Sequence, residues 1–224
     1  MFDIVFISYN EINAEKNFNN LRQRFPLAKH VSGVKGIHQA HIAAAKRSFS
    51  PMFWVVDADA EVLDTFNFDY PVVKEEYDIV HVWRSRNPIN GLEYGYGGVK
   101  LLPKQLTLNV DVSSTDMTTN ISPRFKAMEE VSNITAFNTD PFTTWRSAFR
   151  ECCKLAVTDS AESKLRLNTW CTVASGEFNE FAKLGALAGQ SYGQKNASDK
   201  EALSKINDFE WLLTTYKLAG HGKD

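Results

Sequence analysis

The residues best suited to chemistry are two aspartates that follow an apolar run. Residues 53–56 are apolar, and Asp57 and Asp59 come directly after them, two positions apart. Such a run is typical of a buried parallel strand, and open α/β sheets bind ligands at the carboxyl ends of their strands. If the chain stays extended, both carboxylates point to one side, where they can bind a hard divalent cation such as Mg²⁺ or Mn²⁺. The pair can also merely cap a turn before Glu61, because Asp-x-Asp alone often arises by chance.

The overall composition is that of an ordinary globular protein. Of its 224 residues, 43% are hydrophobic and 23% are charged, which is enough to bury a sizeable core. The formal net charge of −2 excludes wholesale attraction to a polyanion but does not exclude a local basic patch. No apolar run reaches the roughly 18 residues of a membrane span, and no signal-like segment opens the chain. We therefore expect a cytoplasmic protein with no membrane partner and with its cysteines reduced.

A polar loop follows the first expected strand. Apart from Asp3, residues 2–7 are apolar and rich in types that favour a central strand. The next residues are Ser8, Tyr9, Asn10 and Glu11. A nucleotide base can stack on Tyr9 while Asn10 and Glu11 bind its edge or its ribose. The same residue types are also common in an ordinary turn and helix cap.

Two β–α units precede the aspartates. The spacing of apolar residues predicts a helix over 14–25, a short strand over 28–34 and a second helix over 37–46. With the strand that ends in Asp57, these segments form a right-handed, doubly wound half-sheet. Lys35 and Gly36 fall in the loop at its mouth, where Lys35 can meet a diphosphate. His38 and His41 can face the same ligand, but a lone histidine on a helix is more often packed or on the surface.

A glycine-rich segment follows the next expected strand, which the alternation of residues 77–84 predicts. The segment contains Tyr96, Gly97, Gly98 and Lys100. Paired glycines beside a strand mark a close approach of the backbone to something else, and Tyr96 offers a stacking face. A β-bulge or a hairpin corner is the alternative interpretation.

The second half of the chain is harder to assign and mostly helical. Residues 106–119 fit either an edge strand or a loop, and residues 121–138 show no clear period. A helix is expected over 145–155, after a turn at Asp140 and a cap at Thr143 or Thr144. Residues 161–218 have a helical pattern, in which the glycines within 184–193 predict two short helices with a mobile connection.

Basic residues recur at every fourth position of the helix over 145–155. They are Arg146, Arg150 and Lys154. A basic stripe is usually a solvated face, but it can also follow a phosphate backbone. Arg84 and Arg86 add to the same basic rim if the fold brings them together.

The order of these segments resembles the nucleotide-sugar half of GT-A glycosyltransferases, especially the family 2-like members. The resemblance rests on residues 8–11, 33–36 and 53–59 and on the alanine-rich helix between them, and it covers about the first half of the chain. It implies an α/β fold with a mixed, mainly parallel sheet flanked by helices, and a helical C-terminal part. We expect one domain over residues 1–224, with a donor-binding half at 1–105 and an acceptor-binding half at 106–224.

The resemblance also implies roles for individual residues. In GT-A enzymes the Asp-x-Asp pair holds Mn²⁺ or Mg²⁺ against the donor diphosphate, so Asp57 and Asp59 are the implied metal ligands. The implied donor contacts are Ser8, Tyr9, Asn10, Glu11, Lys35, Gly36, Tyr96, Gly97, Gly98 and Lys100. His221 resembles the third metal ligand that many members take from a C-terminal histidine, although a frayed tail is the alternative. Glu151 or its rival Asp140 resembles the carboxylate that deprotonates the acceptor hydroxyl, although either can equally form an intrahelical ion pair.

Residues 143–152 look like the compact glycosyltransferases of T4-like bacteriophages. These enzymes modify hydroxymethylated cytosines in phage DNA, one branch with arabinose. The resemblance implies a double-stranded DNA partner whose target base is flipped out of the duplex. The nucleic-acid contacts would be Arg84, Arg86, Arg146, Arg150 and Lys154.

We therefore expect a metal-dependent, inverting glycosyltransferase with a nucleotide-diphosphate sugar donor, UDP-linked by preference. Two other classes remain open. A nucleotidyltransferase would use a similar sheet and paired acids, but it would carry a glycine-rich basic loop after the first strand, which residues 8–11 are not. A non-catalytic nucleic-acid-binding module would keep the basic stripe without needing Asp57 and Asp59.

Overall fold

The chain folds into two compact units. The computed structural model describes residues 1–95, 98–112 and 120–221. Unit 1 comprises residues 1–86 and 93–136, and unit 2 comprises residues 87–92 and 137–224. None of the helices in the described residues combines the length and the hydrophobicity that crossing a bilayer requires.

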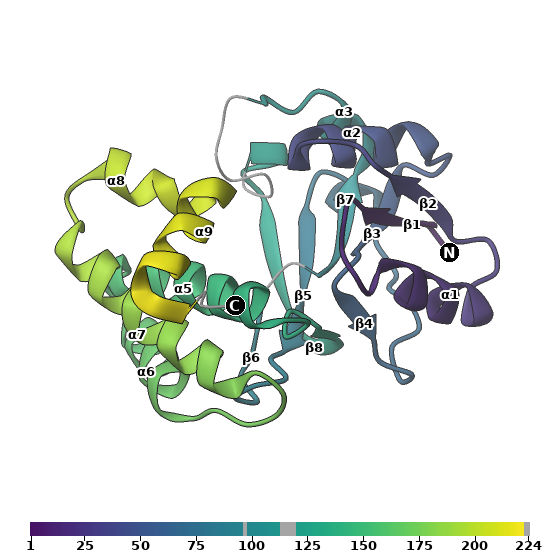
Figure 1. The fold of residues 1–224 in the computed structure, drawn as a ribbon. Helices are drawn as coiled ribbons and strands as arrows, with labels where there is room; N and C mark the ends of the chain where they lie inside the picture. The colour runs from purple at the N-terminus through teal and green to yellow at the C-terminus, as the bar shows by residue number, and fades with distance from the viewer. Residues whose placement is uncertain (96–97, 113–119, 222–224) are drawn as a thin grey trace. The chain divides into compact units, whose positions relative to one another are not determined.

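Unit 1 is built on one mixed β-sheet (Figure 1). The strands are β1 (Asp3–Ser8), β2 (Lys29–Ser32), β3 (Met52–Asp57), β4 (Ala60–Val62), β5 (Val80–Arg86), β6 (Glu93–Tyr94), β7 (Val99–Pro103) and β8 (Phe125–Thr135). Their order is β2-β1-β3-β7-β5-β8-β4, and β6 pairs with β5. Strands β1, β2, β3, β5 and β8 run in one direction, and β4, β6 and β7 run in the other. The predicted α/β class with a mixed, mainly parallel sheet is confirmed.

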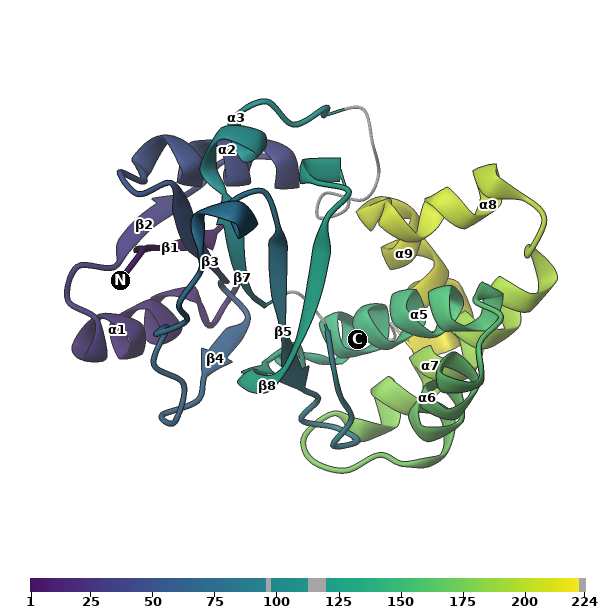
Figure 2. The same cartoon turned by 180° about the vertical axis from the view of Figure 1, so that it is seen from behind.

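Helices cover both faces of this sheet, as Figure 2 shows from behind. Alanines of α2 (Ile37–Arg47) pack against Val5 and Val55 on one face, where α3 (Lys104–Leu108) also lies. Apolar residues of α1 (Ala14–Arg24) pack on the other face, around the buried rings of Trp54 and Trp83. A short 3₁₀ turn, η1 (Lys74–Glu76), precedes β5. We call the face that α1 covers the α1 layer and the face that α2 covers the α2 layer. Because neighbouring residues of a strand point to opposite faces, each strand residue belongs to one of these two layers.

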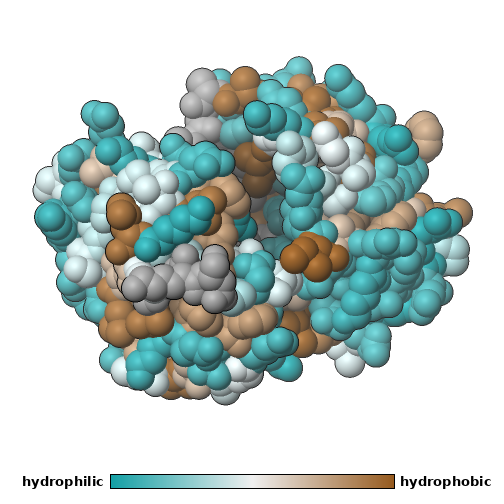
Figure 3. Space-filling model, in the orientation of Figure 1, coloured by the Kyte–Doolittle hydropathy of each residue, from teal (hydrophilic) through white to brown (hydrophobic). Residues whose placement is uncertain are grey.

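The outward side of α1 is polar, which follows from its sequence. Between its buried apolar positions the helix carries charged and amide residues that are exposed. Hydrophilic residues accordingly cover the surface over α1, on the right of Figure 3. This is the amphipathic arrangement that the spacing of residues 14–25 predicts.

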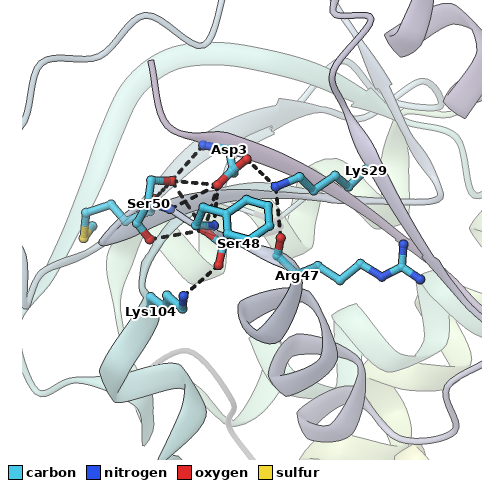
Figure 4. Close-up of polar contacts among 8 residues, drawn as sticks. Asp3, Lys29, Arg47, Ser48, Ser50 and Lys104 are labelled. Atoms are coloured by element: carbon cyan, nitrogen blue, oxygen red, sulfur yellow. Dashed lines mark hydrogen bonds and ion pairs between the residues drawn. The ribbon is translucent and has the colours of Figure 1, made fainter.

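A polar cluster anchors the start of β1 (Figure 4). Asp3 accepts hydrogen bonds from the backbone nitrogens of Phe49 and Ser50 at 2.6 and 3.1 Å, and forms an ion pair with Lys29 at 2.5 Å. Lys29 also donates to the carbonyl oxygen of Arg47 at 2.9 Å. The cluster ties β1 and β2 to the chain between α2 and β3, at the strand ends opposite to Asp57.

Unit 2 is helical. Its helices are α5 (Pro141–Val157), α6 (Ala161–Thr172), α7 (Asn179–Lys195), α8 (Lys200–Ser204) and α9 (Phe209–Tyr216), with the short turns η2 (Lys205–Asn207) and η3 (Lys217–His221). Its apolar core gathers the rings of Trp145, Phe149 and Tyr216 around Leu212. Residues 87–92 join this unit through Ile89, whose carbonyl oxygen accepts from the backbone nitrogen of Ser175 at 2.9 Å.

The prediction that the glycines within 184–193 separate two short helices with a mobile connection is wrong. The segment belongs to the continuous helix α7, and its glycines form a stripe that lies against the backbone of α5. A Cβ atom added at Gly185 or Gly189 would lie 2.3 Å from the carbonyl oxygen of Trp145 or 2.2 Å from that of Phe149. The glycines therefore permit close helix packing and do not break the helix.

Three local assignments also change. Residues 121–138, which show no clear period, contain the 11-residue strand β8. The segment after residue 103 starts with the short helix α3 and not with an edge strand, and residues 113–119 lie outside the described residues. Asp140 itself caps α5, because its carboxylate accepts from the backbone nitrogen of Thr143 at 2.8 Å, so Thr143 and Thr144 are inside the helix and are not its cap.

Candidate active site at the carboxyl end of β3

The turn that carries Asp57 and Asp59 is held by the surrounding elements of unit 1. Asp57 ends β3, and its backbone nitrogen donates to the carbonyl oxygen of Gly98 at 2.9 Å. The carbonyl oxygen of Ala58 accepts from the side chain of Asn17 on α1 at 2.9 Å. The carbonyl oxygen of Asp59 accepts from the backbone nitrogen of Ala136 at 2.7 Å. Because these three backbone groups are hydrogen-bonded, this turn presents its two carboxylates from a fixed position.

Lys100 forms an ion pair with Asp57. Its Nζ atom lies 2.7 Å from Oδ2 of Asp57, and the Lys100 side chain is only 3% exposed. Lys100 on β7 is paired with Val55 of β3, and Asp57 follows Val55 by two residues, so both side chains point into the α2 layer. Burial raises the pKa of Asp57 above its ordinary value, although the positive charge of Lys100 opposes that shift.

Burial and the charges of Asp57, Lys100 and Glu11 shift the pKa of Asp59. Burial raises its pKa to about 6, and the negative charge of Asp57 adds to the shift. Lys100 acts in the opposite direction, and Glu11 raises the pKa further. The structure thus brings Asp57, Asp59, Lys100 and Glu11 together at one edge of the sheet.

This carboxylate pair fits a divalent cation. The Oδ1 atom of Asp57 is buried and has no hydrogen-bond partner among the described residues. The negative charge of Asp57 raises the pKa of Asp59, and a cation that neutralises both carboxylates would stabilise the pair. Within the described part of the chain, no group of three or more His, Cys, Asp or Glu side chains forms a complete metal site. Such a pair suits Mg²⁺ or Mn²⁺, which commonly complete their coordination with water and substrate phosphates.

The loop after β1 is exposed next to this edge. Tyr9 is 49% exposed, and its backbone nitrogen donates to the Glu11 carboxylate at 2.8 Å. Asn10 and Glu11 are also exposed. The hydroxyl of Ser8 contacts Nε2 of His30 at 2.8 Å, so Ser8 joins β1 to β2. The sequence did not predict the contact of His30 with Ser8, because this contact arises only when β1 pairs with β2.

The segment before α2 provides no side-chain cap for the first turn of that helix. Gly36 has a φ of +95°, a conformation that favours glycine, and no side chain of the described residues caps the helix that it precedes. Lys35 beside it is exposed. His38 and His41 face the sheet, with 8% and 0% of their surfaces exposed. The packed interpretation of the two histidines therefore holds.

Gly98 allows a close approach in the glycine-rich segment. A Cβ atom at Gly98 would lie 2.7 Å from Nδ2 of Asn133, which is fully buried on β8. The Asn133 side chain accepts hydrogen bonds from Ser85 and Ser132, both at 2.9 Å. This polar network is absent from the sequence prediction because β8 itself was not predicted. Tyr96 and Gly97 lie outside the described residues.

Most of the predicted basic rim has structural partners. Arg86 pairs with Glu93 at 2.8 Å, whereas Arg84 is exposed. In unit 2, Arg146 stacks over the rings of Phe142 and Phe209 at 5.9 and 5.3 Å from their centroids. Arg150 donates to the side chain of Asn207 at 2.9 Å, and Lys154 is exposed. Arg146 and Arg150 therefore bind α5 to the segments η2 and α9.

The candidate bases and the candidate third metal ligand also belong to unit 2. Burial raises the pKa of Asp140, but its hydrogen bonds from Thr143 and Thr139 outweigh that effect and lower the pKa overall. Glu151 is half-buried on α5. The side chain of His221 lies outside the described part of the structure.

Comparison with known proteins gives only distant similarities. No protein-family model matches the sequence, and no curated protein matches it. HddC from Yersinia pseudotuberculosis has a TM-score of 0.36 and 13% identity over 59% of this chain and 92% of its own. The mannosyltransferase PcManGT from Pyrobaculum calidifontis, solved with GDP-Man and Mn²⁺, has a TM-score of 0.39 and 11% identity over 97% of this chain and 87% of its own. These scores are too low to assign a shared function.

Proposed function

We propose that this chain is a metal-dependent glycosyltransferase that uses a nucleotide-diphosphate sugar as donor. The observation that carries the proposal is the grouping of Asp57, Asp59 and Glu11 at the carboxyl edge of the sheet, beside the exposed ring of Tyr9. Open α/β sheets bind their ligands at this edge, and a carboxylate pair there suits a cation that a diphosphate also ligates.

In this proposal each part of the site has one task. Tyr9 stacks on the nucleoside base, and Asn10 and Glu11 bind its edge or ribose. The backbone amides of the first turn of α2, together with Lys35, bind the diphosphate. Asp57 and Asp59 would hold Mn²⁺ or Mg²⁺, which would supply positive charge where negative charge develops on the departing diphosphate. Glu151 or Asp140 takes the proton from the acceptor hydroxyl, and the reduced basicity of Asp140 favours Glu151.

A thermal-shift screen of nucleotide sugars with and without Mn²⁺ tests the donor. Binding raises apparent stability by mass action, by about 2.7 kcal/mol at a hundredfold excess over Kd. We expect wild type to be stabilised by a UDP- or GDP-linked sugar only when Mn²⁺ is present. Asp59→Asn should lose this effect, whereas Glu61→Gln, a nearby acid outside the proposed pair, should keep it. No stabilisation of wild type by any nucleotide sugar would contradict the proposal.

The finer proposal concerns sugar and acceptor. The sequence resemblance supports a UDP-linked pentose such as arabinose as the donated group, and 5-hydroxymethylcytosine in duplex DNA as the acceptor, flipped out of the helix. Exposed Arg84 and Lys154 are the basic residues left to contact phosphates. Incubation with radiolabelled donor should label hydroxymethylated but not unmodified duplexes. If the chain is only a DNA-binding module, Asp59→Asn will bind DNA normally and wild type will transfer no sugar.

A further inference from the structure

The α2 layer contains a buried histidine that the proposed mechanism does not use. His41 is 0% exposed, and its Nδ1 atom donates to the carbonyl oxygen of Ile37 at 2.8 Å. Because Nδ1 carries the proton of the neutral ring, Nε2 has a free lone pair and is a hydrogen-bond acceptor. This Nε2 atom is buried and has no partner among the described residues. A buried acceptor without a donor is costly, so its presence requires an explanation.

Lys100 is the cation that acts on this acceptor. Its side chain points into the α2 layer, because it is paired with Val55, which packs against the alanines of α2. Its positive charge contributes to the lowered pKa of His41, second to burial, so the two side chains are electrostatically coupled. The ammonium group of Lys100 already contacts Oδ2 of Asp57 at 2.7 Å. Lys100 therefore lies in the same buried layer as two acceptors. One is the Asp57 carboxylate, which it contacts, and the other is Nε2 of His41, which has no donor among the described residues.

A divalent cation and the Lys100 ammonium compete for the same carboxylate. Both are positive, and their repulsion in a buried site is poorly screened by solvent. Asp57 can offer Oδ1 to a metal ion, but an ammonium at Oδ2 weakens that interaction. A cation that binds tightly must therefore move Lys100, and because the ammonium is almost fully buried, it needs a hydrogen-bond acceptor in the position to which it moves.

We propose that Lys100 is a positioning residue that occupies Asp57 until a divalent cation binds, and that Nε2 of His41 accepts the displaced ammonium. This inference rests on the proposed function, because it concerns the same metal site. It gives the buried histidine a role and explains how Asp57 remains neutralised before the cation arrives. His41 is then a second positioning residue, which acts on the site only through Lys100.

Mn²⁺ binding without any nucleotide sugar tests the inference, with electron paramagnetic resonance of free Mn²⁺ as the readout. Lys100→Met should bind Mn²⁺ about tenfold more tightly than wild type, because the competing charge is gone. Lys100→Arg keeps the charge and should remain close to wild type. If Lys100→Met does not fold, as circular dichroism will show, Lys100→Gln replaces it.

A double-mutant cycle isolates the role of His41. His41→Phe should weaken Mn²⁺ binding about fivefold in the wild-type background and have no effect in the Lys100→Met background, since no ammonium then needs an acceptor. The matched control is His81→Phe. His81 is equally buried on β5, but it lies in the opposite layer with Trp83 and should not affect Mn²⁺ binding in either background.

The outcomes separate this inference from the proposed function. If wild type binds no Mn²⁺ but Lys100→Met does, competition by Lys100 is supported. If neither binds Mn²⁺, the metal-dependent function and the inference both fail. If wild type binds Mn²⁺ and Lys100→Met binds it no more tightly, only the inference is overturned. A His41→Phe effect that persists in the Lys100→Met background would overturn the acceptor role of His41.

Discussion

Gly98, directly before β7, tests how closely the chain must approach the Asn133 side chain beside the site. We expect Gly98→Ala to destabilise the protein by about 1–3 kcal/mol, because overpacking a filled interior has a cost of this size. The added methyl group would lie 2.7 Å from Nδ2 of Asn133 and 3.2 Å from Cβ of Ala60. Gly95→Ala is the matched control, since its Cβ would meet only Val82, at 4.0 Å. Urea denaturation measures both variants, and equal stabilities would refute the packing argument.

Asp3 gives a prediction for the pH dependence of stability. Burial raises its pKa, but Lys29 and the backbone nitrogens of Phe49 and Ser50 outweigh burial and lower the pKa from 3.8 to about 2. A lowered acid pKa stabilises the fold above the unfolded-state pKa, by about 2 kcal/mol here, and this stabilisation is lost as the pH falls through the folded-state value. Asp3→Asn should therefore lose about 2 kcal/mol at pH 7.

The difference between Asp3→Asn and wild type should shrink as the pH falls from 4 towards 2. Urea denaturation at several pH values follows it. The exposed Asp69 serves as control, and Asp69→Asn should match wild type across the range. A constant difference between Asp3→Asn and wild type at all pH values would show that the carboxylate charge is not responsible.

Individual site residues were predictable from the sequence to different degrees. Asp57 and Asp59 stand out because an apolar run ends in two acids, and the structure places both at one sheet edge. The ion pair of Asp57 with Lys100 was not predictable, because it depends on the register between β3 and β7, which are far apart in sequence. The role that we propose for His41 was likewise not predictable, because it depends on the packing of α2 against that face of the sheet.

At the level of elements, the glycine stripe of α7 gives a prediction about helix packing. Gly189→Ala would gain helix propensity of about 1 kcal/mol at an open site. Here its Cβ would lie 2.2 Å from the carbonyl oxygen of Phe149, a backbone atom that cannot move without shifting α5. We therefore expect a net loss of stability of about 1–3 kcal/mol.

Urea denaturation of Gly189→Ala measures the effect, with Ser191→Ala as control. Ser191 lies on the same helix and is exposed, so its substitution should change stability by less than about 0.5 kcal/mol. An increase in stability for Gly189→Ala would mean that α5 and α7 separate at little cost.

The same stripe shows why some elements were predictable and others were not. Local spacing predicted α1, α2 and β3 because each buries one continuous pattern of apolar residues. Glycine at every fourth position is ambiguous, since it favours a break in an isolated helix and close packing against a partner. Strand β8 was missed because most of its first half is exposed and its pairing with β5 shifts register, which removes the alternation.

At the level of the whole molecule, the two units have separate apolar cores. The sheet of unit 1 buries one cluster on each face, and the helices of unit 2 enclose a third cluster around Trp145 and Leu212. The chain nevertheless crosses between the units after residues 86, 92 and 136. The sequence could not predict these crossings, because the membership of residues 87–92 depends on Ile89, whose partner Ser175 is far along the chain.

Separate cores predict that damage to one unit stays local. Leu101→Ala in unit 1 and Leu212→Ala in unit 2 each remove a side chain that is 0% or 1% exposed, at a cost of about 2–5 kcal/mol. Hydrogen exchange should show faster exchange in β1, β3 and β7 for the first variant and in α5, α7 and α9 for the second. Mn²⁺ with a bound nucleotide sugar should then slow exchange in unit 1 of the Leu212→Ala variant, because every proposed donor contact lies there. Faster exchange throughout the chain in both variants would instead show that the two cores unfold as one.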